Sequence, residues 1–177
     1  MPTRSPKRAI DVQVFPEFRS AVRAVWVRKV ATAALASVDP GGLAGASIVV
    51  ADDDTLHDLN ARFRGLDELT DVLSFGDTSD PSLASDGAPP DSRFPDPQDE
   101  EPSLGEVVLS YPLAVRQADA HNVSVEREVA LLVVHGILHL LGHDHAATDD
   151  EAAMKALETT ALSAVFPTSA PGARGVS

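Results

Sequence analysis

LLVVHGILHLLGHDH, residues 131–145, holds four of the six histidines in the 177-residue chain. The apolar run extends back to Val125, and its spacing predicts a helix over 125–141. In such a helix His135 and His139, four residues apart, lie on one face, one turn from each other. Two histidines in this arrangement can reach one zinc ion at about 2.0–2.1 Å per bond. A lone histidine on an apolar helix is usually an inert core residue, but this clustering favours a metal site.

The third ligand must come from the residues that follow the helix. If the helix continued, His143 would lie about 12 Å along the axis from His135, too far for one ion. Gly142 predicts that the helix ends and the chain reverses there. A reversal needs a residue or two before a side chain points back, which favours His145 over His143 as the third ligand.

Three protein ligands leave a fourth coordination position for water, which is the catalytic arrangement of zinc, whereas structural zinc sites are usually closed by four ligands. The alternative is that His143 or Asp144 closes the site. Asp144 is more simply an acceptor that orients a histidine. The chain has no cysteine, so nitrogen and oxygen atoms must bind the metal, and three histidines favour one Zn²⁺ ion.

The metalloprotease motif HExxH is close to this pattern but incomplete. Its general-base glutamate follows the first histidine, and Gly136 occupies that position here. A protease of that type would therefore lack its base. Gly136 belongs instead to the side of the helix that is predicted to face the core, together with Val129, Leu132 and Val133.

The rest of the chain predicts alternating strands and helices in one domain that spans residues 1–177. Strands are expected over 9–15, 46–51, 71–75 and 104–110, and helices over 16–37, 52–64, 111–120 and 148–165. Leu56, Leu59 and Phe63 should share one side of the 52–64 helix. No Gly-rich phosphate loop supports a doubly wound nucleotide-binding fold.

Charge is concentrated in one segment. The chain carries a formal net charge of −13, which argues against a generic nucleic-acid binder. Residues 77–103 have eight acids and one base, and so carry −7 of that charge. We predict that this Pro-rich segment is a mobile acidic loop between two strands, with a lid or partner-binding segment as the alternative. The tail, 167–177, is expected to be flexible.

A second polar constellation lies in LNARFRGLDELTDVLSFG, residues 59–76. Arg64 stands before Gly65 at the end of the predicted helix, and a guanidinium is a fork-shaped donor suited to phosphate. The alternative is that Arg64 is a solvated surface residue. Neither a signal peptide nor an apolar run of about 20 residues is present, so we expect a soluble, cytoplasmic protein.

Taken together, these stretches resemble the YbeY family of bacterial endoribonucleases that mature ribosomal RNA. The resemblance extends from about residue 10 to 165. It rests on four motifs: HGILHLLGHDH (135–145), LNARFRGLDELTDVLSF (59–75), LGEVVLS (104–110) and EAAMKALE (151–158). It implies an α+β fold, with a small mixed β-sheet and packed helices, one of them carrying the HxxxH motif. It also implies zinc ligands at His135, His139 and His145, and an arginine implicated in activity at Arg64.

The resemblance further implies a zinc-dependent single-strand endoribonuclease in 3′-end maturation of small-subunit ribosomal RNA and in ribosome quality control. The expected partners are ribosomal RNA and small-subunit ribosomal proteins, with neither membrane nor DNA. The sequence departs from the family pattern at His143, usually tyrosine, at Glu106, usually aspartate, and at Leu69, usually proline. The 77–103 segment is also longer than the family's loop.

Two other functions compete with the nuclease. One is a non-catalytic, zinc-stabilised module that binds the ribosome or RNA, and the acidic net charge favours it because acidic faces repel phosphate. The other is a different metallohydrolase, whose peptidase form is disfavoured by Gly136. The three-histidine site and Arg64 favour the nuclease.

Overall fold

The computed structural model describes residues 8–76, 102–143 and 148–167. Its strands are β1 (Ile10–Val14), β2 (Gly45–Ala51), β3 (Val72–Gly76) and β4 (Ser103–Ser110). Its helices are η1 (Pro16–Phe18), α1 (Ala24–Val38), α2 (Asp53–Arg64), α3 (Tyr111–His121), α4 (Val125–Leu140) and α5 (Thr148–Val165). None of these helices is long and apolar enough to span a membrane.

The four strands form one mixed sheet in the order β1-β2-β4-β3. β1, β2 and β4 run parallel, and β3 pairs antiparallel with β4 at one edge, with Gly76 opposite Gly105. The α+β class and the small mixed sheet are therefore confirmed. The strands that flank the acidic insert are confirmed as well, while residues 77–101 and the tail beyond 167 lie outside the described parts.

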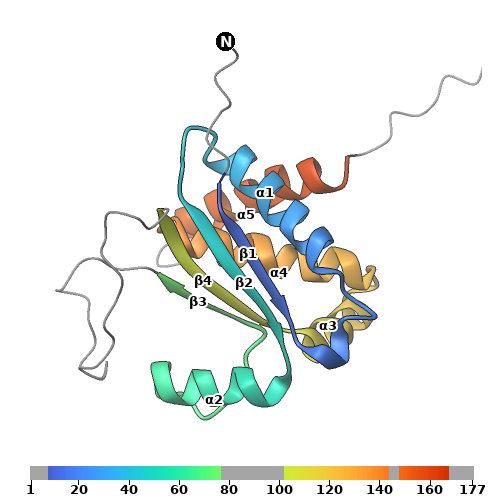
Figure 1. Ribbon diagram of the computed structural model, residues 1–177. Coiled ribbons are helices and arrows are strands. Elements are labelled where there is room, and N and C mark those ends of the chain that lie inside the picture. Colours follow the sequence, from blue (N-terminus) through green and yellow to red (C-terminus); the bar gives the residue numbers. More distant parts are fainter. Residues whose placement is uncertain (1–7, 77–101, 144–147, 168–177) are drawn as a thin grey trace, which may run out of the picture.

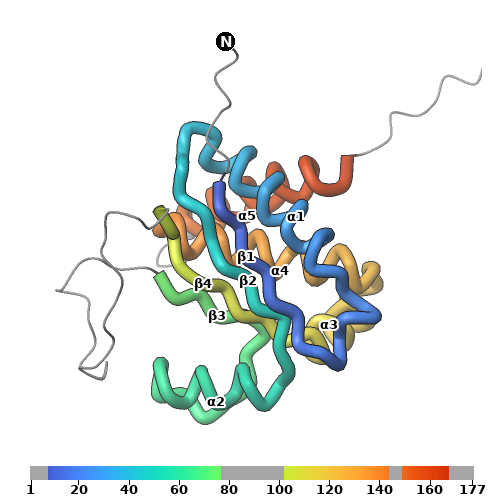
Figure 2. Tube along the Cα trace, viewed as in Figure 1, coloured from blue at the N-terminus to red at the C-terminus, as the bar shows by residue number. Residues whose placement is uncertain are grey.

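Helices cover the two faces of the sheet unequally (Figure 1). α1 and α4 pack on one face and α5 packs on them, whereas α2 lies alone across the other face. The alternation of β4 produces this arrangement, because Val107 and Leu109 belong to the larger core and Val108 packs with Leu56 under α2. The Cα trace in Figure 2 shows α4 running behind the sheet on the side away from α2.

One expectation about local structure was wrong. The single helix over 16–37 is instead the short 3-10 helix η1, a turn, and then α1. Phe18 O accepts from Val22 N at 2.8 Å and Arg19 Nε donates to Val14 O at 3.2 Å, and these bonds stabilise the turn. Phe63 lies on the same side of α2 as Leu56, as predicted, because its ring contacts Phe75, which packs against the Leu56 cluster; the side chain is nevertheless 66% exposed.

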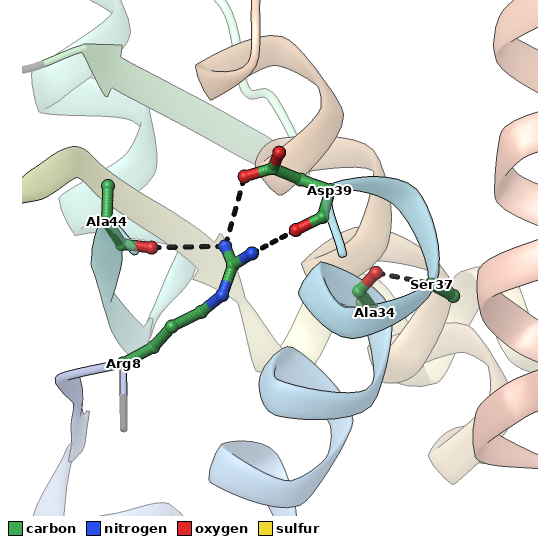
Figure 3. A network of polar contacts seen from close by, with 5 residues as sticks. All are labelled: Arg8, Ala34, Ser37, Asp39 and Ala44. Atoms are coloured by element: carbon green, nitrogen blue, oxygen red, sulfur yellow. Dashed lines mark hydrogen bonds and ion pairs between the residues drawn. The ribbon is translucent and has the colours of Figure 1, made fainter. Parts of the chain in front are cut away.

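One arginine ties the start of the sheet to the turn between α1 and β2 (Figure 3). Arg8 donates to the carboxylate and the carbonyl oxygen of Asp39, and to Ala44 O at 3.2 Å. A Cβ at Gly42 would displace the Asp39 carboxylate from this arginine. These contacts join the residue that precedes β1 by two positions to the turn that leads into β2.

Candidate metal site

The candidate site lies on the C-terminal half of α4, which packs closely on the sheet. Ser124 caps the start of α4 by accepting from Arg127 N. Further along, a Cβ at Gly136 would lie 2.4 Å from Val107 Cγ1, closer than real Cβ atoms approach. Position 136 therefore faces the sheet and has no room for a side chain. This packing explains why the general-base glutamate of a metalloprotease is missing here.

The ring nitrogens of His135 and His139, one turn apart on α4, converge. The two Nε2 atoms are 3.0 Å apart, and the rings meet edge to face with centroids 4.6 Å apart. Both side chains are half-buried. Two nitrogens bound to one tetrahedral zinc at about 2.0–2.1 Å lie about 3.3 Å apart. The spacing thus fits two ligands of one ion with a small adjustment, as the sequence predicted.

Glu158 of α5 contacts the Nδ1 side of the His135 ring. Its Oε1 lies 2.6 Å from His135 Nδ1, a short contact typical of a charge-assisted hydrogen bond. Glu158 was not predicted from the sequence as part of the site. Its signal was weak, because Glu158 is 23 positions from His135 and only the packing of α5 on α4 brings them together.

The end of α4 has the predicted chain reversal. Gly142 has φ +91, and its N–H donates to His139 O while His143 N donates to Leu138 O. This pair of bonds is the Schellman motif, which ends helices at a glycine. His143 is exposed and lines a small cavity of about 150 Å³ with Gly142, Asp150 and Ala153.

The third ligand stays a prediction. His145 and Asp144 lie outside the described residues, and the parts that the structure does describe contain no group of three potential ligands. His135 and His139 are two of the three predicted ligands. The observed reversal at Gly142 is the feature on which the choice of His145 depends, and it is confirmed.

β3 links the arginine-containing stretch, residues 59–76, to the histidine helix α4. Ser74 Oγ donates to Gly136 O at 2.9 Å, so the strand that follows the arginine stretch is bonded to the histidine helix. Arg64 itself is the last residue of α2, on the opposite face of the sheet (Figure 1). It is exposed, and its side chain has no hydrogen bond or ion pair among the described residues. β3 contacts both α2 and α4, so it is the strand that lies between the two constellations.

Comparisons with known proteins show which family the chain belongs to. The family model Endoribonuclease YbeY matches residues 15–165. An Endoribonuclease YbeY from Dehalococcoides mccartyi is 41% identical over 86% of this chain and 87% of its own length, and one from Roseiflexus castenholzii is 40% identical over 88% and 92%. The solution structure of TM1509 from Thermotoga maritima is 23% identical, with a TM-score of 0.57 over 94% of this chain and 100% of its own, and so shares the fold. The chain belongs to the YbeY endoribonuclease family.

Proposed function

We propose that this protein is a zinc-dependent endoribonuclease that cuts single-stranded RNA. The observation that carries the proposal is the convergence of His135 Nε2 and His139 Nε2, 3.0 Å apart, in a chain of an endoribonuclease family. His145, just past the reversal, is the proposed third ligand. One coordination position then remains for water or a phosphate oxygen.

Each part of the site has a distinct task. The histidines hold the ion, and Glu158 orients His135. A bound zinc ion would supply Lewis acidity toward a phosphoryl oxygen or a water molecule. Arg64, at the end of α2, stabilises negative charge on the phosphoryl group as the bond breaks. The guanidinium is free of ion pairs within the described residues, so its donors are available to phosphate.

The proposed substrate is the 3′ end of small-subunit ribosomal RNA, with a role in ribosome quality control in the cytoplasm. Membership of the family supports this assignment. Small-subunit ribosomal proteins are the proposed protein partners. Guidance by such partners would also offset the formal net charge of −13, which by itself repels RNA.

A non-catalytic zinc module that binds RNA or the ribosome is the second candidate, because the acidic charge favours it. In that case His143 or Asp144 closes the coordination sphere. A peptidase is disfavoured, since Val107 leaves no space for a glutamate at position 136.

The test measures zinc content and cleavage of single-stranded and duplex RNA in His→Ala variants. We expect changes at His135, His139 or His145 to remove both zinc and cleavage, while His143→Ala keeps most of each. His57→Ala is the matched control, because His57 lies on α2, away from the proposed zinc ligands, and pairs with Asp67 at 2.8 Å. Full zinc content with no RNA cleavage under any condition would support the non-catalytic module instead.

A further inference from the structure

We propose that Glu158 is a positioning residue that fixes the tautomer and orientation of His135 and thereby sets the affinity of the site for zinc. The inference rests on the proposed zinc site and extends it to a residue on another helix. Its basis is the 2.6 Å contact between Glu158 Oε1 and His135 Nδ1.

The tautomer follows from the chemistry of the pair. An ionised carboxylate only accepts hydrogen bonds, so the proton of a neutral His135 ring must sit on Nδ1. Nε2 then carries a lone pair, and this is the atom that faces His139 at 3.0 Å. With the opposite tautomer, Nε2 would carry a proton where a metal ion should bind. Glu158 therefore prepares His135 as a ligand before zinc arrives.

The environment strengthens this contact. The side chains of His135 and Glu158 are 25% and 16% exposed, so water competes weakly for the hydrogen bond. α5 is held firmly, because Met154, Ala161 and Leu162 are buried in the main core on either side of Glu158 along the helix. The carboxylate is thus presented by a rigid element, and the ring of His135 is held between α5 and His139.

The chain offers a matched control in a second histidine–glutamate pair. His121 Nδ1 lies 3.3 Å from Glu128 Oε2, with Glu128 buried in the first turns of α4. This is also a histidine–carboxylate pair, and its glutamate lies on α4, two turns before His135, while His121 is the last residue of α3. Glu128→Gln removes a buried carboxylate without touching the proposed site.

The experiment measures zinc affinity of the full-length protein by competition with a chromophoric chelator. We expect Glu158→Ala to weaken zinc binding about 10–100-fold, the range for partners of metal-bound histidines. Glu158→Gln keeps an amide oxygen that can accept from Nδ1, so it should recover part of the affinity. Glu128→Gln should bind zinc like the wild type.

A second readout uses the metal-free protein. The ¹⁵N chemical shifts of the His135 ring should report a proton on Nδ1 in the wild type and a shift toward the Nε2-protonated tautomer in Glu158→Ala. Unchanged shifts and unchanged zinc affinity in folded Glu158→Ala would overturn the inference while the zinc site stands. Failure of the wild type to bind zinc would instead remove the proposed function, and the tautomer measurement would still decide the role of Glu158.

Discussion

At the scale of single residues, Gly136 and Val107 decide what chemistry the histidine helix can have. The Cβ of any larger residue at 136 would lie 2.4 Å from Val107 Cγ1. Sequence spacing placed position 136 on the core side of the helix but gave no sign of how closely β4 approaches. That distance depends on the register of α4 against the sheet, which is set by contacts distant in sequence.

We predict that the effect of Gly136→Ala changes sign with its neighbour. In a helix interior, alanine gains about 1 kcal/mol over glycine, but overpacking a core typically costs about 1–3 kcal/mol. Gly136→Ala should therefore lower the free energy of unfolding in the wild type and raise it in Val107→Ala, where both γ-methyl clashes are gone and only the Cβ of residue 107 stays close, at 3.2 Å. Urea denaturation of the four proteins of this double-mutant cycle measures the coupling. Equal effects in both backgrounds would show that the close approach is absent.

Arg64 should separate catalysis from metal binding. Removal of one preorganised donor to developing charge costs other enzymes about 100–1000-fold in rate. Arg64→Ala should therefore lose most single-strand RNA cleavage while its zinc content and circular dichroism stay unchanged. Arg64→Lys should recover only part, because an ammonium lacks the two parallel donors of a guanidinium. Arg62→Ala is the control: Arg62 is on the same helix turn and pairs with Asp58. Wild-type cleavage by folded, zinc-loaded Arg64→Ala would exclude this role.

At the scale of elements, the sequence predicted the end of α4 but not the break between η1 and α1. Apolar spacing predicted α4, and Gly142 predicted its reversal, because both signals are local. The break between η1 and α1 escaped prediction, since the stabilising bond from Arg19 to Val14 O joins a turn to a strand. The role of Glu158 could not be predicted for the same reason, because its partner, His135, lies on another helix.

Gly142→Ala tests whether the reversal positions the third ligand. At φ +91 an alanine is strained, and a left-handed conformation costs L-residues about 1–2 kcal/mol. We expect this loss in the free energy of unfolding, together with weaker zinc binding because the residues after the reversal are displaced. Gly41→Ala is the matched control, since Gly41 has open space around its Cβ position and no positive φ. Normal zinc affinity in Gly142→Ala would mean that the reversal does not set the ligand geometry.

At the scale of the whole molecule, the fold class followed from the alternation of strands and helices and from the resemblance, and the structure confirms it. The strand order did not follow, because nothing local states that β4 inserts between β2 and β3. α2, which ends at Arg64, packs on the face of the sheet opposite α4. The sequence thus identified both constellations, but their separation by the β3 edge required the structure.

The acidic insert should be dispensable for folding. Gly76 and Gly105 are paired, so the ends of the segment are already close, and a short linker can join them. We predict that a Gly/Ser linker in place of residues 78–101 leaves the melting temperature within a few degrees, because loop-closure entropy changes by only about 0.6 kcal/mol per doubling of length. Pro102 must be kept, since its carbonyl accepts from Gly45 N at 2.8 Å. A fall of ten degrees or more would show that the insert packs on the core.

The most direct test of the central claim is restoration of RNA cleavage by zinc. The full-length protein is stripped with a chelator, reloaded with increasing zinc, and assayed on single-stranded RNA carrying the 3′ end of small-subunit ribosomal RNA, beside His139→Ala treated in the same way. We expect that cleavage is lost on stripping, returns with one equivalent of zinc, and never appears in His139→Ala. Undiminished cleavage by the stripped protein, or by His139→Ala, would contradict this expectation.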